Sequence, residues 1–380
     1  MAFQSKLPIQ GISIFSIMSG LAKDENAINL SQGFPNFDCD PVLIELVRKN
    51  MVDGNNQYAP MLGVAALREV IANKIQALYK INIDSNREVT ITAGATQAIF
   101  NSIQTVVQPG DEVIVIEPAY DSYIPAIKLC GGHPVSFQIQ APEFKIDWAE
   151  LGKLITERTK MLIINNPHNP TATKLDKQDL DALNTLLVDK DIYLLSDEVY
   201  EHLVYDGAAH TSILSYPELY KRSFITYSFG KTFHATGWKI GYLVAPPYLT
   251  KEFRKIHQFT VFSVNTPIQY ALAEYMQQPE TYLGLANFYQ QKRDLFLEAM
   301  KESALKPLPS QGTYYALFNY SAVSQLNELD FAKELTRTHK VATIPISPFY
   351  TDKIENQVVR ICFAKKEDTL LEAASRLSSL

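Results

Sequence analysis

A lysine in the middle of the chain has neighbours suited to covalent chemistry with a carbonyl compound. Lys231 ends the turn Ser228-Phe229-Gly230-Lys231, directly after the apolar run 224–227, which predicts a buried strand. A lysine forms an imine when it is reachable, partly desolvated and close to charges that lower its pKa. Ser228 and Lys239 add a hydroxyl group and a second cation, which together suit a phosphate monoester. A lysine in a glycine-containing turn is usually only a surface residue, so the rest of the chain must decide.

Composition narrows the class of protein. A chain of 380 residues suggests two domains, or one large and one small, and 46% hydrophobic with 20% charged residues is ordinary for a globular enzyme. The net charge of -6 disfavours nucleic acid or an anionic membrane as the main partner. Cys39, Cys130 and Cys362 are widely separated and form no CxxC pair, so we expect neither a metal site nor a disulfide framework. Without a membrane-spanning run or a signal-peptide pattern, the expected location is cytoplasmic.

Strand and helix patterns alternate through most of the chain. Strands are predicted at 88–92, 112–116, 161–165, 192–196 and 224–227, and helices at 97–107, 120–129 and 177–188. This alternation predicts an α/β fold with a mostly parallel sheet flanked by helices. The last hundred residues predict helices at 279–303, at 330–339 and after Lys366, with antiparallel strands between them. We therefore expect an N-terminal arm that is also part of the small domain (1–40), a large domain (41–278) and a smaller α+β domain (279–380).

Small and polar residues follow three of the predicted strands. In an open parallel sheet, ligands bind beyond the carboxyl ends of the strands. The turn 92–97 leaves backbone N–H groups at a helix N-terminus for an anion. The loop 165–170 contains two prolines, which we expect to direct Asn169 inward, although a plain proline turn is an equal alternative. Asp197 ends a buried strand, where it either caps a helix or pairs with a buried cation.

Taken together, these residues resemble the class I/II, fold-type I pyridoxal-phosphate aminotransferases over essentially the whole chain. The order Asn169, Asp197, Tyr200, Ser228, Lys231, Lys239 is similar to that of the family. The segments 30–35, 57–58, 117–120 and 359–360 resemble the methionine and kynurenine aminotransferase branch. Two positions depart from many members, since Gly230 replaces a second phosphate-binding serine and Lys239 replaces an arginine. Both variants are usual in this branch.

The resemblance implies a role in holding pyridoxal phosphate for each residue of the motif. Lys231 would carry the cofactor as an internal aldimine, Asp197 would keep the ring nitrogen protonated, and Tyr200 with Asn169 would bond the phenolic oxygen. The freed Lys231 amine would then shuttle a proton. The expected phosphate ligands are Ser228, Lys239 and the amides of Ala95 and Thr96. Tyr120 would stack on the ring, or is simply a core aromatic residue.

A second group of residues concerns the substrate and a partner subunit. Arg360 lies in a strand that otherwise looks buried, where a guanidinium needs a planar anion such as the substrate α-carboxylate. The alternative is a structural ion pair with a protein carboxylate. Gly33 and Asn169 would contact the same substrate. In relatives, the residue matching Tyr58 reaches the phosphate of the neighbouring subunit, so the resemblance implies a homodimer with shared active sites.

The candidate pocket residues are apolar or aromatic: Ile14, Phe15, Phe34, Tyr58, Tyr120, Phe262 and Tyr314. Core packing accounts for some of them. No arginine is obviously placed for a second substrate carboxylate, although Arg254 or Arg293 could swing in as arginines do in some relatives. The pattern favours methionine, then aromatic amino acids, over aspartate as the amino donor, with a 2-oxo acid as acceptor.

Two alternatives to this function stay open. A kynurenine aminotransferase or a cysteine-conjugate β-lyase would share every cofactor contact and differ in substrate or in the later fate of the carbanion. A cofactor-binding transcriptional regulator would carry a basic winged-helix segment, whereas only about 30 residues precede Gly33, which argues against that class. The preferred donor, the acceptor and the pathway are not specified by these motifs.

Overall fold

A seven-stranded sheet forms the centre of the computed structural model, which describes residues 5–8, 11–378 and 380. The strand order is β2 (Val89–Thr92), β8 (Gly241–Val244), β7 (Ser223–Ser228), β6 (Tyr193–Asp197), β5 (Thr159–Asn165), β3 (Glu112–Glu117) and β4 (His133–Gln138). Neighbouring strands run parallel except β8, which is antiparallel to both β2 and β7. The predicted α/β fold with a mostly parallel sheet is confirmed.

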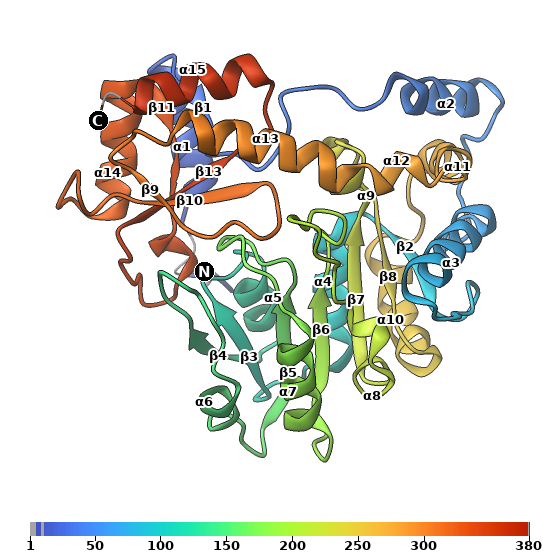
Figure 1. Ribbon diagram of the computed structural model, residues 1–380. Helices are drawn as coiled ribbons and strands as arrows, with labels where there is room; N and C mark the ends of the chain where they lie inside the picture. Colours follow the sequence, from blue (N-terminus) through green and yellow to red (C-terminus); the bar gives the residue numbers. More distant parts are fainter. Residues whose placement is uncertain (1–4, 9–10, 379) are drawn as a thin grey trace, which may run out of the picture.

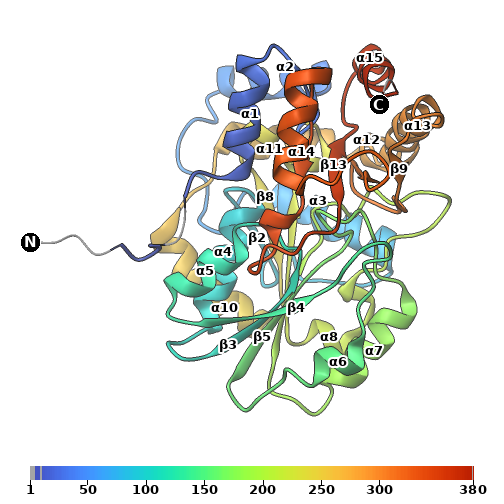
Figure 2. The same cartoon turned by 90° about the vertical axis from the view of Figure 1, so that its left-hand side faces the viewer.

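Helices cover both faces of this sheet (Figure 2). One face carries α4 (Gly94–Val106), α5 (Tyr123–Leu129) and α10 (Pro247–Thr260), and the other carries α6 (Trp148–Gly152), α7 (Lys177–Leu187) and α8 (Pro217–Tyr220). All six residues of β3 are buried because its two faces are both covered. Beyond β2 lie α3 (Ala65–Tyr79), α2 (Pro41–Val52) and α11 (Thr266–Tyr275) (Figure 1).

A smaller antiparallel sheet lies above the upper ends of the central strands (Figure 1). Its order is β12 (Ile344–Pro345), β13 (Val358–Cys362), β10 (Tyr315–Asn319) and β9 (Lys306–Pro307). Next to it are α13 (Leu285–Ala299), α14 (Glu328–Glu334), α15 (Glu367–Leu377) and the short parallel pair β1 (Ile28–Asn29) and β11 (Val341–Ala342). The N-terminal helix α1 (Ile14–Asp24) contacts β1, β11 and β12. The domain boundaries proposed from the sequence stay a prediction.

Two helices differ from the sequence prediction. The expected helix 279–303 is divided into α12 (Glu280–Leu283) and α13, with Gly284 between them. The expected helix 330–339 begins earlier, at Glu328, and its last turn is a π-helix over Leu335–His339. Within the described residues, no helix is long and apolar enough to cross a membrane.

Candidate active site

A cavity of about 360 Å³ opens where β5, β6 and β7 end below the smaller sheet. Most of the residues singled out from the sequence line it: Phe15, Gly33, Ala95, Thr96, Tyr120, Asn169, Asp197, Tyr200, Ser228, Lys231 and Lys239. Residues from both sheets contribute, because Tyr315 of β10 also lines the cavity. The fold therefore brings together side chains that lie more than 200 residues apart in the sequence.

Lys231 lies in the short helix α9 (Phe229–Thr232), which follows β7 directly. Its Nζ donates to the hydroxyl of Tyr314 at 2.6 Å and to the carbonyl of Gly33 at 3.1 Å. Removal from bulk water lowers the pKa of Lys231 to about 8, and the nearby cations of Arg360 and Lys239 act in the same direction. A substantial neutral fraction near neutral pH is what an imine-forming or proton-transferring amine requires.

Asp197 is buried at the end of β6, on the floor of the cavity. Its Oδ2 accepts a hydrogen bond of 2.6 Å from the hydroxyl of Tyr123, and its Oδ1 lies 3.4 Å from both Thr226 Oγ1 and the amide nitrogen of Val199. Burial raises the pKa of Asp197 to about 6, against the effect of these hydrogen bonds. A buried carboxylate with this environment is suited to a cationic partner in the cavity.

Two glycines, Gly94 and Gly241, allow a close approach of Lys239 and β8 to the start of α4. A Cβ atom at Gly94, which has φ +77°, would lie 3.6 Å from Lys239 Nζ, so this ammonium group lies against the first turn of α4. A Cβ atom at Gly241 would lie 2.4 Å from the carbonyl oxygen of Tyr227 and 3.1 Å from the amide nitrogen of Ala95. Glycine at 241 thus allows β8 to bring Lys239 to the helix N-terminus, an arrangement that favours a phosphate.

Gly230 occupies the position where many relatives have a serine, and the structure supplies a reason. A Cβ atom there would lie 2.9 Å from the Cα of Thr236 and 3.3 Å from the carbonyl oxygen of Ala235. Both contacts are with backbone, which cannot move aside as a flexible side chain could. Ser228 and Thr96 remain as hydroxyl groups in the cavity wall, and Thr96 Oγ1 lies 3.3 Å from the hydroxyl of Tyr120.

Arg360 is completely buried and lies behind the cavity wall. Its Nη1 donates to Asn169 Oδ1 at 2.6 Å and its Nη2 to the carbonyl of Ser31 at 3.3 Å, while its Nε has no hydrogen-bond partner among the described residues. The guanidinium carbon lies 3.8 Å from the centre of the Tyr315 ring. No described carboxylate lies within ion-pair distance of Arg360, so the alternative of a structural ion pair finds no support.

Five of the candidate pocket residues do not line this cavity: Ile14, Phe34, Tyr58, Phe262 and Tyr314. Tyr58 is 83% exposed, and Phe34 and Phe262 are each 46% exposed. The ring of Tyr58 packs edge-on against Phe262 at 5.5 Å. A single subunit therefore leaves these aromatic rings on its surface, and their predicted places in a shared active site stay a prediction.

The two arginines considered as partners for a second substrate carboxylate, Arg254 and Arg293, make hydrogen bonds outside the cavity. Arg254 donates to Thr90 Oγ1 and to the carbonyl groups of Asn86 and Val89. Arg293 makes two hydrogen bonds to Asp206, one of 2.8 Å, and donates to the carbonyl of Ser310 at 2.8 Å. Neither residue lines the cavity.

Comparison with known proteins decides the family. The model of the family aminotransferase class I and II matches residues 25–377 of this chain. The chain belongs to this family. Its members transfer an amino group between an amino acid and a 2-oxo acid, and they depend on pyridoxal phosphate.

Individual relatives cover the chain almost completely. The methionine aminotransferase of Escherichia coli K12 is 50% identical over 378 residues, covering 99% of this chain and 98% of the relative. A solved structure of Escherichia coli YbdL, described as having a methionine aminotransferase function, has a TM-score of 0.97 at 49% identity, with full coverage of both chains. Human kynurenine--oxoglutarate transaminase 3 is 32% identical over 403 residues, covering 97% of this chain and 88% of that protein.

Four contributors to the site were not identified as such from the sequence. Tyr123 bonds Asp197, and Tyr315 lies between Gly33, Tyr200 and Arg360. A Cβ atom at Gly33 would lie 1.9 Å from the hydroxyl oxygen of Tyr315, so this close approach requires glycine. Glu198 accepts hydrogen bonds from Ser196 and Tyr227, and Glu201 pairs with Lys74; neither glutamate lines the cavity. No local motif marks these residues, because each acts through a contact with a distant segment.

Proposed function

We propose that this protein is a pyridoxal-phosphate-dependent aminotransferase that takes the amino group from methionine, and from other apolar or aromatic L-amino acids, and passes it to a 2-oxo acid. The observation that carries this proposal is the position of the Lys231 amine, which lies in one cavity with the buried carboxylate of Asp197 and the Lys239 cation at the start of α4. A homodimer with shared active sites is part of the proposal, on the basis of the exposed Tyr58 and Phe262 pair.

The residues of the cavity fit the chemical groups of the cofactor. Bound pyridoxal phosphate supplies an electron sink, which is strongest when its ring nitrogen is protonated. Asp197 would hold that proton, and Lys239, Ser228 and the first turn of α4 would hold the phosphate. Asn169 and Tyr200 would donate to the phenolic oxygen, and Arg360 would receive the substrate carboxylate. Lys231 would then move a proton at the substrate α-carbon.

Borohydride reduction followed by peptide mapping tests the central assignment. We expect the purified holoenzyme to acquire one stable pyridoxyl group, on the peptide that contains Lys231. The Lys231→Ala variant should acquire none there, and Lys239 should stay unlabelled in both proteins. A pyridoxyl group found on another lysine of the parent protein would show that the proposed function has been assigned to the wrong residue.

Replacement of Arg360 by lysine should raise the KM for the amino donor by about 10–100-fold. The reason is that an ammonium group cannot donate the two parallel hydrogen bonds that a guanidinium group donates to a carboxylate. Cofactor affinity should change little, since Arg360 lies on the Asn169 and Ser31 side and not against α4. Steady-state kinetics with methionine and a cofactor titration measure the two effects. Arg254→Lys is the matched control, because Arg254 makes three hydrogen bonds outside the cavity. Loss of cofactor with an unchanged KM would contradict the role.

Methionine should be used with a kcat/KM at least ~100-fold higher than aspartate. Full burial of an apolar side chain gains about 1.5–3 kcal/mol, whereas an unpaired buried carboxylate costs several kcal/mol. Arg254 and Arg293, the two arginines considered as possible partners of such a carboxylate, are held by other residues. A coupled assay with methionine, phenylalanine, tyrosine, kynurenine and aspartate measures the order. Equal efficiencies for aspartate and methionine would refute the apolar pocket but leave the aminotransferase activity intact.

A further inference from the structure

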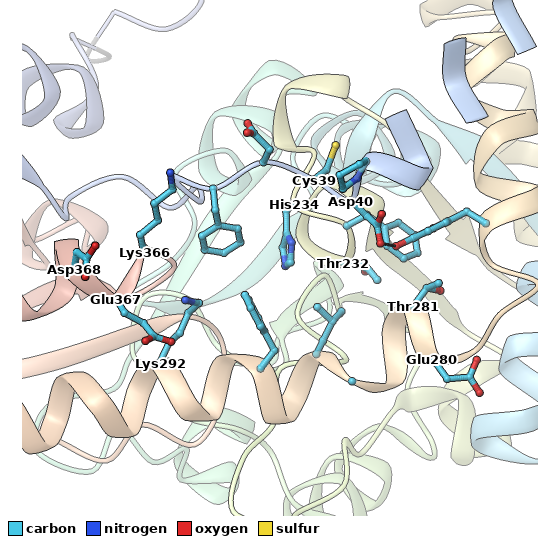
Figure 3. A pocket seen from close by; sticks show the side chains of 18 residues that line it. Cys39, Asp40, Thr232, His234, Glu280, Thr281, Lys292, Lys366, Glu367 and Asp368 are labelled. Carbon is cyan, nitrogen blue, oxygen red and sulfur yellow. Dashed lines mark hydrogen bonds between the residues drawn. The ribbon is translucent and has the colours of Figure 1, made fainter. Parts of the chain in front are cut away.

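A second cavity, larger than the candidate active site, has no part in the function proposed above. Its volume is about 780 Å³, and we call it the Lys292 cavity. Five segments line it: the loop 37–41 ahead of α2, residues 232–234 directly after Lys231, Tyr275 at the end of α11, the α12–α13 region, and residues 366–368 at the start of α15 (Figure 3). The cavity thus lies between the loop ahead of α2, the turn that follows Lys231 and the helices α11, α12, α13 and α15.

Lys292 extends from α13 into this cavity although little of it is exposed (Figure 3). Only 8% of the residue is accessible to solvent. Its Nζ lies 4.9 Å from the centre of the Phe288 ring and 5.2 Å from that of Phe37. Among the described residues it has neither a hydrogen bond nor an ion pair. Two aromatic faces compensate a buried ammonium group only in part, so this cation retains donors for an anion.

His234 supplies a second polar group without a partner. Its Nε2 is buried and has no hydrogen bond to a described residue. The ring lies edge-on to Phe37 at 5.0 Å and close to Phe288 at 5.5 Å, which are the same two rings that contact Lys292. Buried polar atoms in proteins nearly always have a partner. Two such groups beside one cavity, with shared aromatic walls, point to a ligand that has both a charge and an apolar body.

The acidic residues of the cavity limit where an anion can lie. Asp40 already caps α2 through the amide of Val42 and accepts a hydrogen bond of 2.8 Å from Tyr275. Figure 3 shows Asp40, Thr281 and Glu280 at the end opposite to Lys292. Glu367 is near Lys292 but forms no ion pair with it. Both cations that line the cavity, Lys292 and Lys366, lie at this end, as does the carboxylate of Asp368 (Figure 3). We therefore place an anion against Lys292, and the apolar body of the ligand against Phe37 and Phe288.

We propose that the Lys292 cavity is a binding site for a small monocarboxylate with an aromatic or long apolar body, distinct from the site that contains Lys231. Its carboxylate would accept hydrogen bonds from Lys292. His234 Nε2 would meet a second polar atom of the ligand. This inference goes beyond the proposed function and does not depend on it, because it rests on residues that line a different cavity.

The position of the site also connects it to the candidate active site. His234 follows Lys231 by three residues, and its ring lies edge-on to Tyr289 at 5.5 Å. Tyr289 in turn lies 5.7 Å from Tyr314, whose hydroxyl contacts Lys231 Nζ at 2.6 Å. A ligand in contact with His234 would therefore be connected to the reactive amine through three rings, those of His234, Tyr289 and Tyr314.

Equilibrium dialysis of the holoenzyme with 3-phenylpropionate tests the proposal. We expect one saturable equivalent per chain in the Lys292 cavity, which adds to any equivalent that the candidate active site binds. The Lys292→Gln variant should bind that equivalent at least ~10-fold more weakly, because its charge-assisted hydrogen bonds are lost. The uncharged 3-phenylpropanamide, which has the same ring, should not occupy the cavity. Transamination by Lys292→Gln should stay within about twofold of the parent, which also shows that the variant is folded.

Two further variants make the result specific to this lysine. Lys292→Arg keeps the cation and should retain the equivalent in the Lys292 cavity. Lys301→Gln removes a charge from an exposed ion pair with Glu298 just after α13 and should bind 3-phenylpropionate as the parent does. Equal binding of the amide, or unchanged binding by Lys292→Gln, would overturn the proposal. None of these results would bear on the assignment of Lys231.

Discussion

Replacement of Asp197 by asparagine is expected to lower kcat for transamination by on the order of 10²–10³-fold, which is the usual effect of removing one preorganised electrostatic contact from an active site. The carboxylate would hold a proton on the cofactor ring by charge, and an amide cannot. The fold should persist, because asparagine has nearly the same shape as aspartate: its one side-chain oxygen can accept from Tyr123 or Thr226, and its NH2 group can donate to the other hydroxyl oxygen. Steady-state kinetics with methionine, together with a denaturation curve, measure both expectations.

A matched variant separates charge from orientation at this position. Tyr123→Phe keeps the Asp197 carboxylate but removes the hydrogen bond of 2.6 Å to its Oδ2. We expect about a tenfold loss of kcat from this change, in line with one hydrogen bond to a charged group. Asp197→Asn with activity within a few-fold of the parent would show that the carboxylate does not act on the ring nitrogen.

The central part of the fold could be predicted from sequence because its signals are local. Strands such as β3 and β5 are continuous apolar runs, and the polar residues that follow β5 and β6 mark the ends of parallel strands. Asn169 and Asp197 therefore line one cavity as expected. The strands β4 and β8 were not predicted; β8 continues a glycine-containing turn, and the residues of β4 are exposed or only half-buried.

Other features follow from contacts that no local pattern encodes. The break between α12 and α13 falls at Gly284, whose low helix propensity is a weak signal inside a long helical pattern. The orientation of Arg360 depends on Asn169, Tyr315 and Ser31, which come from three distant segments. The sequence indicated that this arginine is buried, but it could not show that its side chain stacks on Tyr315 behind the cavity wall.

The second large expected effect is a loss of stability, and it concerns the buried ion pair between Lys74 and Glu201. Lys74 of α3 pairs with Glu201 and donates to the hydroxyl of Tyr242 at 2.9 Å. Both side chains are almost completely buried. Burial alone would raise the pKa of Glu201, but the Lys74 cation outweighs it and lowers the pKa, so the carboxylate is ionised at neutral pH. Glu201 directly follows Tyr200 and so fixes the segment that carries the candidate catalytic residues.

Lys74→Met should therefore destabilise the protein by about 3–5 kcal/mol, because it leaves the Glu201 carboxylate buried without its cation. Lys49→Met is the matched control, since Lys49 pairs with Glu274 at 2.8 Å on the surface, where loss of an ion pair costs about 1 kcal/mol or less. The double variant Lys74→Met/Glu201→Gln should regain much of the lost stability, because glutamine can still accept the hydrogen bond of 2.9 Å from Tyr79 without a buried charge. Urea denaturation of the four proteins measures these differences. If Lys74→Met were no less stable than Lys49→Met, the buried pair would not be what holds the segment of Asp197 and Tyr200 in place.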